Sequence, residues 1–378
     1  MEPEVSTYPI GEPGGRARLD TPALLLDLEA LDRNIARMAA HCRRTGQALR
    51  PHAKTHKSVE VARRQIAAGA VGQCCATLGE AEVLGRAGIP GVLVTSPVVG
   101  PRRAARLAAL NETTQGLMAV ADDRGAVAAL ASVVTGKPLS LLVDVDVGTR
   151  RTGVPSAQAA VALARQIAET PGLIFAGIQG YAGHLQHIYD YAERARAAAA
   201  VSEQLAHVCA VLAGDGLSPP LVTGGGTGTH DFDHRHGVLG ELQAGSYALM
   251  DVDYGKVALT ADGQPGPFEP ALFVATTVVS AASDEFAIID AGLKALATDG
   301  PMPLFARGAP EGAVYSFAGD EHGRVHYAAG NPARLKVGDI VELHPPHCDP
   351  TVNLYDTYHA MRGDVLEAVW PVDARGRR

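Results

Sequence analysis

Cysteine is scarce in this sequence, and the few cysteines lack the spacing of a disulfide framework or a zinc site. The chain has five, an odd and scattered set with no Cys-x-x-Cys pair: Cys42, Cys74, Cys75, Cys209 and Cys348. Small secreted domains stapled by disulfides carry an even number of cysteines at short spacings. The cysteine usage therefore predicts reduced thiols and a cytoplasmic location.

Long apolar runs and basic clusters are also missing. The sequence has no uninterrupted apolar run of about 18 residues, the length that spans a bilayer. Its N-terminus carries Glu2, Glu4 and Glu12 without an apolar core, which is unlike a secretory signal peptide. The formal net charge is −8, whereas nucleic-acid-binding domains are usually basic. We therefore expect neither a membrane nor a nucleic acid as a partner.

The composition is that of a globular protein with a large core. The chain has 378 residues, of which 47% are hydrophobic and 20% are charged, a balance typical of folded domains. This length exceeds one ordinary domain and accommodates a barrel of about 250 residues together with a smaller module.

Residues 21–260 alternate between short apolar runs and helical stripes. The first run, 23–27, is followed by a stripe at spacings of three and four: Leu28, Leu31, Ile35, Met38 and Cys42. Further runs of strand length cover residues 48–53, 72–77, 92–95, 117–120, 139–145, 173–181 and 220–223. Eight such runs predict a parallel sheet, and this number favours closure into a TIM-type (β/α)8 barrel. An open, doubly wound sheet is the alternative.

From residue 261 onward, helical periodicity gives way to short strand-like runs separated by Gly, Pro and Asp. The runs cover residues 271–280, 285–290, 314–317, 339–343 and 365–369, a spacing typical of β domains. We therefore predict an α/β fold, with the barrel at 21–260 and a second, mostly β C-terminal domain at 261–378. Residues 1–20 are expected to form an arm that joins the β domain.

The stretch Leu49–Lys57 places two histidines and two lysines in one run without an acidic residue. Its front half is typical of a short strand. A lysine among cations has its pKa lowered, because its charged form is disfavoured. A neutral amine near pH 7 is what Schiff-base chemistry requires. The stretch is therefore a candidate for such chemistry, and a solvated basic strand end is the alternative.

Four glycines and three threonines follow the last predicted barrel strand, over residues 223–229. Glycines let main-chain amides approach an anion, and threonine hydroxyls add donors. In barrels, the loops after strands seven and eight often bind a phosphate. The pattern therefore favours an anion site over a flexible turn. It lacks the Gly-Lys-Ser/Thr ending of a nucleoside-triphosphate loop.

Two polar segments follow the sixth and seventh predicted strands, at the edge where barrel active sites lie. Arg150 and Arg151 follow the sixth, where an arginine could hold a ring nitrogen or a carboxylate; a surface position is the alternative. Tyr181, His184 and His187 follow the seventh. The two histidines are three residues apart and could share a helical face, so that one acts as a general base. A pair of hydrogen-bonded loop histidines is the alternative.

His347, Cys348 and Asp349 form a His-x-Asp pattern within the predicted β domain. In an extended segment, residues two apart project to the same side. An imidazole and a carboxylate together suit a divalent metal of intermediate hardness, such as Mn²⁺, Zn²⁺ or Co²⁺. A polar turn before Pro350 is the alternative.

Together, these motifs resemble the fold-type III pyridoxal-phosphate enzymes with an alanine-racemase-like barrel and, within them, the D-threonine aldolase group. The resemblance extends from Asp20 to Trp370 and rests on the segments 50–54, 223–228, 241–247, 290–294 and 347–351. It implies pyridoxal 5'-phosphate and a divalent metal as cofactors. Mn²⁺ is the metal expected first, with Co²⁺, Mg²⁺ or Zn²⁺ as alternatives. It also implies a homodimer.

The resemblance gives each candidate residue a role. It implies that Lys54 binds the cofactor covalently, that Arg151 faces the pyridine nitrogen and that Tyr181 lies beside the cofactor. The cofactor phosphate would lie against Thr223, Gly224, Gly225, Gly226, Thr227 and Gly228, with Tyr254 as a neighbour. The metal would be held by His347 and Asp349. His187 would be the base near the substrate hydroxyl.

The reaction that the resemblance implies is the cleavage of a D-3-hydroxy amino acid, of the D-threonine or D-phenylserine type, to glycine and an aldehyde. The alternatives are a 3-hydroxy-D-aspartate aldolase and a metal-dependent D-serine or 3-hydroxyaspartate dehydratase. The related dehydratases typically carry a cysteine where this chain has Asp349. A racemase would need a tyrosine base from the β domain. A non-catalytic pyridoxal-phosphate carrier would lack the β domain and the metal pair.

Overall fold

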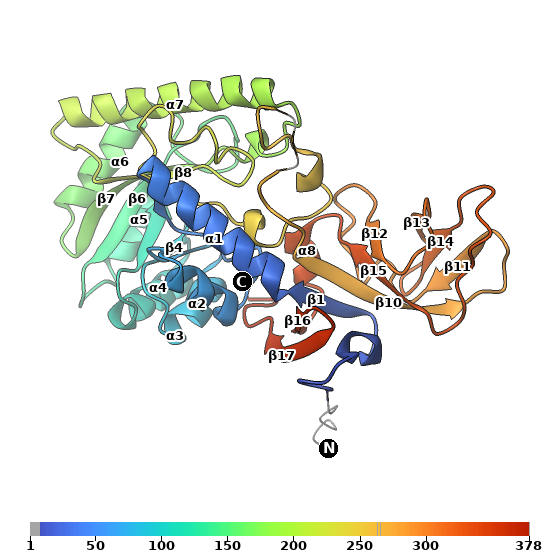
Figure 1. Ribbon diagram of the computed structural model, residues 1–378. Coiled ribbons are helices and arrows are strands. Elements are labelled where there is room, and N and C mark those ends of the chain that lie inside the picture. The colour runs from blue at the N-terminus through green and yellow to red at the C-terminus, as the bar shows by residue number, and fades with distance from the viewer. Residues whose placement is uncertain (1–7, 263, 265, 378) are drawn as a thin grey trace, which may run out of the picture. The chain divides into compact units, whose positions relative to one another are not determined.

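The computed structural model describes residues 8–262, 264 and 266–377. The chain divides into two compact units. The barrel unit comprises Ile35–Tyr247, Val257–Pro267 and Gly376–Arg378. The β unit comprises the described residues of Met1–Asn34, together with Ala248–Lys256 and Phe268–Arg375. Each unit contains its own sheet (Figure 1).

Among the described residues, eight parallel strands form the sheet of the barrel unit, in the order β2-β9-β8-β7-β6-β5-β4-β3. They are β2 (Ala48–Leu49), β3 (Gln73–Cys75), β4 (Val92–Val94), β5 (Met118–Ala121), β6 (Leu139–Asp144), β7 (Leu173–Gly180), β8 (Leu221–Gly224) and β9 (Glu241–Leu242). The main-chain N of Ala53 donates to O of Cys74 at 2.8 Å, and N of Cys74 donates to O of Pro51 at 2.7 Å. These bonds join the two ends of the order, so the sheet closes into the predicted barrel.

Helices alternate with the barrel strands, and all of those below except α1 contribute to one apolar core. They are α1 (Leu28–Thr45), whose first residues belong to the β unit, α2 (Val59–Ala67), α3 (Leu78–Arg86), α4 (Pro101–Thr113), α5 (Arg124–Ala131), α6 (Ala157–Glu169) and α7 (Tyr191–Gly214). Several begin at a polar residue whose side chain accepts a main-chain N–H of the first turn: Ser58, Thr77, Asp123, Ser156 and Asp190. Each such cap contributes about 1 kcal/mol to helix stability.

One strand assignment made from the sequence is wrong, and one barrel strand was missed. The run at 23–27 does form a strand, β1 (Ala23–Asp27), but it pairs with strands of the β unit, antiparallel to β10 (Leu272–Ser280) and parallel to β16 (Thr357–Arg362). A run that is apolar throughout does not reveal which sheet it joins. The missing barrel strand is β9, which has two residues and contains a glutamate. It is too short and too polar to give an apolar signal.

The β unit contains, within the described residues, a sheet of nine strands. Besides β1, β10 and β16, these are β11 (Phe286–Ile289), β12 (Leu304–Arg307), β13 (Val314–Phe317), β14 (Gly323–His326), β15 (Ile340–His344) and β17 (Val365–Pro371). The order is β13-β14-β11-β10-β1-β16-β17, and β15 pairs with both β10 and β12. A short helix, α8 (Cys348–Val352), follows β15. The expected β-rich second unit is therefore present.

The described part of the N-terminal arm, from residue 8 onward, lies on the β unit. Ile10 forms a parallel bridge with Leu366, and the N of Gly14 donates to Oδ2 of Asp364 at 2.8 Å. Arg16 forms an ion pair of 2.7 Å with Glu342. Residues 1–7 of the expected arm lie outside the described residues.

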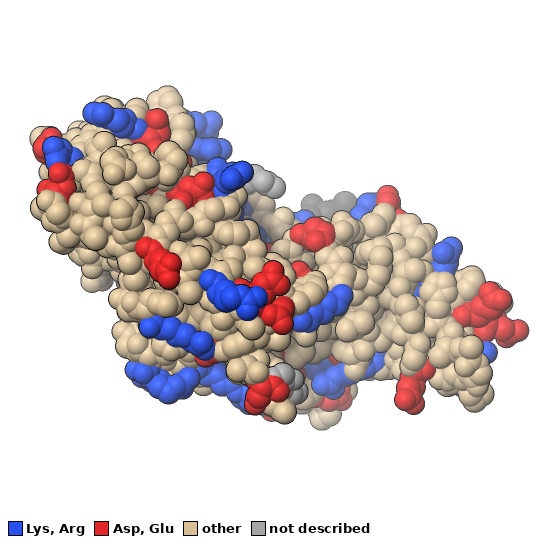
Figure 2. All heavy atoms as spheres, turned by 90° about the horizontal axis from the view of Figure 1, so that it is seen from above, with Lys and Arg blue, Asp and Glu red and all other residues tan. Residues whose placement is uncertain are grey.

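Charged side chains of both signs are interspersed on the face seen in Figure 2. Within the described residues, one helix, α7, is long and apolar enough to cross a membrane by length and composition alone. Its buried side chains Arg194, Ala198, Ser202, Leu205, Val208 and Leu212 recur at helical spacing. Leu205, Val208 and Leu212 belong to the core that the barrel strands share, so this face packs within the protein.

Candidate active site

Lys54 lies in the turn that follows β2, at the carboxyl end of a barrel strand. The strand is extended beyond its two assigned residues, because N of Arg50 donates to O of Leu242 at 3.0 Å and N of His52 donates to O of Ala244 at 3.1 Å. N of Lys54 donates to Nδ1 of His52 at 3.4 Å. The pairing with β9 therefore places the turn that carries the half-buried Lys54.

The second lysine of this stretch has an acidic partner that the local sequence does not show. Nζ of Lys57 lies 2.5 Å from Oε1 of Glu80, and both side chains are largely buried. Glu80 belongs to α3, where it also completes the capping box of Thr77. The expectation of a run of uncompensated cations around Lys54 is therefore wrong in part, because one of its charges is paired.

Arg50 of the same motif has a structural role. Its guanidinium forms a two-pronged ion pair with Glu241, with Nε–Oε1 and Nη2–Oε2 distances of 2.9 and 2.7 Å. Both side chains are buried. Buried pairs of this geometry are costly to break, because the remaining charge loses its partner. The pair joins β2 to β9 and so supports the turn of Lys54.

A chain of polar side chains crosses the barrel interior and was missed from the sequence. Nε2 of Gln179 donates to Oδ1 of Asp144 at 2.9 Å, and Nε2 of Gln243 donates to Oε1 of Gln179 at 3.1 Å. Gln243 also donates to Oγ1 of Thr223 at 3.0 Å, and Thr223 donates to Oε1 of Glu241 at 2.8 Å. The hydroxyl of Thr223 is thus engaged inside the barrel. A glutamine within an apolar strand was the available signal.

The glycine loop after β8 is packed closely on its own protein. Gly225 has a positive φ of 68°, and a Cβ there would overlap the carboxylate of Asp233. The N–H of Gly226 donates to Oδ2 of Asp233 at 3.2 Å, and that of Gly228 donates to Oε1 of Gln186 at 2.8 Å. Two of the loop amides expected for an anion therefore already have protein partners. The glycines are required by packing as well as by any ligand.

We expect Gly225→Ala to lower both stability and cofactor affinity. The left-handed backbone and the overlap with Asp233 should cost about 1–3 kcal/mol of unfolding free energy. Urea unfolding measures the first effect, and titration of the apo-protein with pyridoxal phosphate measures the second. Gly214→Ala at the end of α7 is the matched control, since a Cβ there meets nothing within 4 Å. Unchanged affinity in a folded Gly225→Ala protein would count against a phosphate site here.

Asp233 is a carboxyl group buried against this loop. It also accepts a hydrogen bond of 2.8 Å from Oγ1 of Thr229. Burial raises the pKa of Asp233 from 3.8 to about 7, and the hydrogen bonds from Thr229 and Gly226 oppose the rise only in part. Between these two values the folded protein holds a proton here that the unfolded chain has released. The contribution of Asp233 to the free energy of unfolding therefore falls as the pH rises toward 7.

Asp233→Asn should remove this pH dependence. At about 1.4 kcal/mol per pKa unit, the ionisation of Asp233 should cost about 3 kcal/mol between pH 5 and pH 8. The amide oxygen of asparagine can still accept from Thr229 and Gly226. Urea unfolding at both pH values is the measurement, with exposed Asp284→Asn as the control. A variant whose stability declines with pH as steeply as that of the parent would contradict the prediction.

Arg151 and Tyr181 are brought together by the loop after β6. The guanidinium carbon of Arg151 lies 5.6 Å from the ring centroid of Tyr181. The loop is fixed by carboxylates: Oγ1 of Thr152 donates to Oδ2 of Asp144 at 2.7 Å, and N of Gly153 donates to Oδ2 of Asp122 at 2.9 Å. Arg151 and Tyr181 also line one small cavity at the carboxyl ends of β6 and β7.

His184 and His187 are both exposed and follow β7. His184 lies in a 3-10 helix, Gly183–Leu185, which ends before His187. The expected shared helical face is therefore absent. Nδ1 of His184 lies 3.3 Å from Oγ1 of Thr149, so this segment contacts the loop that carries Arg151.

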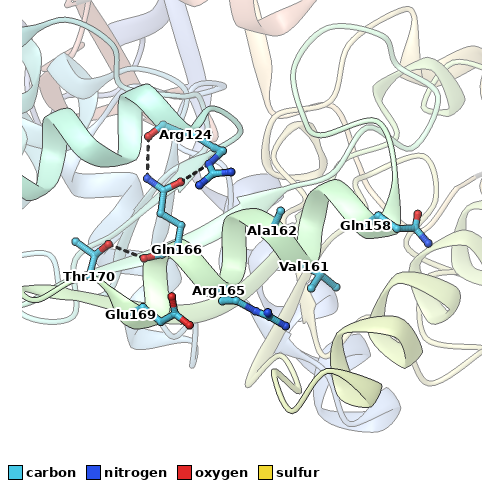
Figure 3. Close-up of a pocket in the computed structure, with 8 residues that line it drawn as sticks. All are labelled: Arg124, Gln158, Val161, Ala162, Arg165, Gln166, Glu169 and Thr170. Atoms are coloured by element: carbon cyan, nitrogen blue, oxygen red, sulfur yellow. Dashed lines mark hydrogen bonds between the residues drawn. The ribbon is translucent and has the colours of Figure 1, made fainter.

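Another groove lies on the outside of the barrel unit, between α5 and α6 (Figure 3). Gln166 donates to O of Arg124 at 3.0 Å within it. None of the predicted site residues lines this groove. It therefore gives no support to the catalytic assignment.

His347 and Asp349 belong to the β unit, and their backbone differs from the expected extended run. His347 is extended, with φ −142° and ψ 125°, but it caps α8, and Asp349 lies in the first turn of that helix. The argument from strand alternation is therefore wrong. Nδ1 of His347 lies 2.9 Å from Oδ2 of Asp299, a partner 48 residues away that no local pattern reveals. Within the described residues, no group of three or more His, Cys, Asp or Glu is placed to hold a metal.

Asp251 holds this segment in place. Its Oδ2 accepts from N of Cys348 at 2.9 Å, and its Oδ1 accepts from N of Tyr254 at 2.8 Å. Cys348 is buried, and its Sγ lies 3.4 Å from Oδ1 of Asp349. Tyr254 also belongs to the β unit, whereas the glycine loop belongs to the barrel unit.

The fold and these sites define a class. A closed parallel barrel, a lysine in the turn after its β2 strand, a glycine loop after β8 and a β unit are features of pyridoxal-phosphate proteins of the alanine racemase type. The model of the alanine racemase N-terminal domain matches residues 26–251, and that of the putative serine dehydratase domain matches residues 271–361.

Similarity to individual proteins identifies the family within this class. The chain is 41% identical to the 3-hydroxy-D-aspartate aldolase of Paracoccus denitrificans (strain Pd 1222), over 96% of this chain and 93% of that protein. It is 41% identical to the D-threonine aldolase of Arthrobacter sp, over 98% and 97%. A crystal structure of D-threonine aldolase from Filomicrobium marinum has a TM-score of 0.91 at 39% identity, over 95% and 97%. The chain belongs to the D-threonine aldolase family within the alanine-racemase-type fold.

Proposed function

We propose that this protein is a pyridoxal-phosphate-dependent aldolase that cleaves the Cα–Cβ bond of D-3-hydroxy amino acids to give glycine and an aldehyde. The similarity to two named aldolases over nearly the whole chain carries the proposal. The Lys54 turn and the Arg151–Tyr181 pair support it, because they provide an amine and a cation at the carboxyl edge of the barrel.

The proposed cofactor would bind mainly to residues of the barrel unit. A side chain at Gly225, Gly226 or Gly228 would collide with protein atoms, so the loop keeps its main chain close to the barrel edge. We propose that Lys54 holds the cofactor covalently, that Arg151 contacts the ring nitrogen and that Tyr181 lies beside the ring. Gly224–Gly228 would hold the phosphate, with Tyr254 as a further candidate. When bound, pyridoxal phosphate supplies an electron sink for the bond that breaks.

Two residues of the β unit are the candidates for a metal site. We propose that His347 and Asp349 bind a divalent metal, Mn²⁺ foremost, with Co²⁺, Mg²⁺ or Zn²⁺ as alternatives. The contact of His347 Nδ1 with Asp299 supports this, because it leaves Nε2 for a metal and resembles the carboxylate–histidine–metal arrangement. A metal there would act as a Lewis acid on the substrate hydroxyl. His187, exposed to solvent, would accept the hydroxyl proton.

A dehydratase is the second candidate, because the β unit matches the putative serine dehydratase domain. Incubation with D-threonine distinguishes the two. An aldolase gives glycine and acetaldehyde, whereas a dehydratase gives 2-oxobutanoate and ammonia. Keto acid without aldehyde would refute the proposed function. A panel containing D-threonine, D-phenylserine and 3-hydroxy-D-aspartate would then identify the preferred side chain.

We also propose that the protein is a homodimer that works in the cytoplasm. All five cysteines lie in the described ranges and none of them forms a disulfide, which supports a reducing compartment. Sedimentation of the holoenzyme tests the dimer, and an active monomer would refute it.

A further inference from the structure

Gln186 joins the glycine loop to the segment that carries the histidines. It is 2% exposed. Its Oε1 accepts from N of Gly228 at 2.8 Å, while its Nε2 donates to Oγ1 of Thr229 at 3.1 Å and to O of Ala182 at 3.3 Å. A Cβ on Gly226 would overlap the side chain of Gln186. The loop and residues 182–187 are therefore packed against each other without spare room.

Arg194 makes the same connection from the other side. This side chain, fully buried in the first turns of α7, donates from Nε to O of Gly228 at 2.7 Å. Its Nη1 donates to O of Ile188 and, at 3.3 Å, to O of Tyr189. Gly228 is thus held at its N–H by Gln186 and at its carbonyl by Arg194.

Gln186 and Arg194 hold the chain on the two sides of His187. Gln186 precedes it, and the carbonyls that Arg194 binds follow it directly. The side chain of His187 itself is exposed. Its main chain therefore depends for its position on neighbours whose bonds end on Gly228 and Thr229.

We propose that Gln186 and Arg194 form a clamp on Gly228 that couples occupation of the glycine loop by a phosphate to the order of residues 182–189, including His187. The inference rests on the proposed function of the loop and of His187. Gln186 and Arg194 are positioning residues, because they act through the loop and through the main chain around His187. Because coupling between two sites is reciprocal, phosphate on the loop should order the histidine segment, and loss of the clamp should weaken phosphate binding.

The first test separates the phosphate from the rest of the cofactor. Apo-protein is titrated with pyridoxal phosphate and with pyridoxal, and the ratio of the two dissociation constants measures what the phosphate contributes. Gln186→Met, of similar volume, should reduce this ratio about tenfold, which corresponds to about 1.4 kcal/mol. Gln158→Met is the control, because Gln158 is exposed on α6 (Figure 3). A ratio equal to that of the control would overturn the clamp.

The second test reads the coupling itself. Inorganic phosphate should slow amide hydrogen exchange in the peptide covering residues 182–189 of the parent protein. Gln186→Met and Arg194→Lys should lose this slowing, whereas exposed Arg196→Lys on the same helix should keep it. A variant with a merely structural defect would melt earlier but retain the response. If Arg194→Lys does not fold, the Gln186→Met result decides.

The outcomes distinguish the clamp from the function. A parent protein that favours pyridoxal phosphate over pyridoxal and shows the phosphate response, yet releases no aldehyde, would refute the aldolase and support the clamp. An active aldolase whose Gln186→Met variant keeps both the ratio and the response would refute the clamp alone.

Discussion

Lys54→Ala is expected to abolish covalent retention of the cofactor and to lower aldehyde release by several orders of magnitude. The reason is that an amine must attack the cofactor's aldehyde, and Lys54 stands in the turn fixed by His52 and by the β2–β9 pairing. After treatment with borohydride, mass spectrometry should find the cofactor on a peptide containing Lys54 in the parent. The variant should show no labelled peptide.

Lys57→Ala is the matched control. Lys57 is three residues away but is paired with Glu80, so its loss should affect stability more than labelling. If the Lys54→Ala protein were still labelled at another lysine, the assignment of Lys54 would be wrong. If Lys57→Ala lost the label while folded, the cofactor lysine would have been misplaced by three residues.

Removal of the metal is expected to leave cofactor labelling at Lys54 unchanged while aldehyde release falls by orders of magnitude. In the proposed site, His347 and Asp349 would supply two ligands, and a site with few protein ligands keeps open positions for water or substrate. Chelation followed by addition of Mn²⁺ or Co²⁺ should therefore restore cleavage. Asp349→Ala should behave like chelated enzyme, whereas exposed Asp284→Ala in the same unit should not.

The metal content of each enzyme sample must be measured together with its rate of aldehyde release. Chelated protein that is confirmed metal-free and cleaves D-threonine at the full rate would falsify the metal proposal. His347 and Asp349 would then be only polar residues at the start of α8. The aldolase proposal would survive that result, since its first test is the product formed.

The strand–helix alternation was readable because apolar runs of strand length directly report buried strands. It failed at β1, where an entirely buried run pairs with β10 and β16. It failed also at β9, where Glu241 is buried and paired with Arg50. Which sheet a run joins, and which charge is paired, are properties of distant partners that a local pattern does not contain.

The site residues show the same limit. The stretch containing Lys54 was found from composition, yet the Glu80 partner of its Lys57 lies on α3, the second helix after the stretch. Asp299, Asp251 and Arg194 gave no signal, since each acts through a residue remote in sequence. Glycines at 225 and 226 did announce a special loop. A side chain at these positions would overlap Asp233 or Gln186, and only the folded chain reveals these neighbours.

The pairing of β2 with β9 bears on how the protein is made. The turn of Lys54 is held by main-chain bonds from residues 50 and 52 to Leu242 and Ala244, so it cannot form until the ribosome has released residue 244. Closing so long a segment is an entropic barrier that grows slowly with length, and non-local pairings delay folding. Before that point, Lys54 of the nascent chain would lack the turn that the pairing of β2 with β9 holds in place. Cofactor loading is therefore expected to follow synthesis of the barrel rather than accompany it.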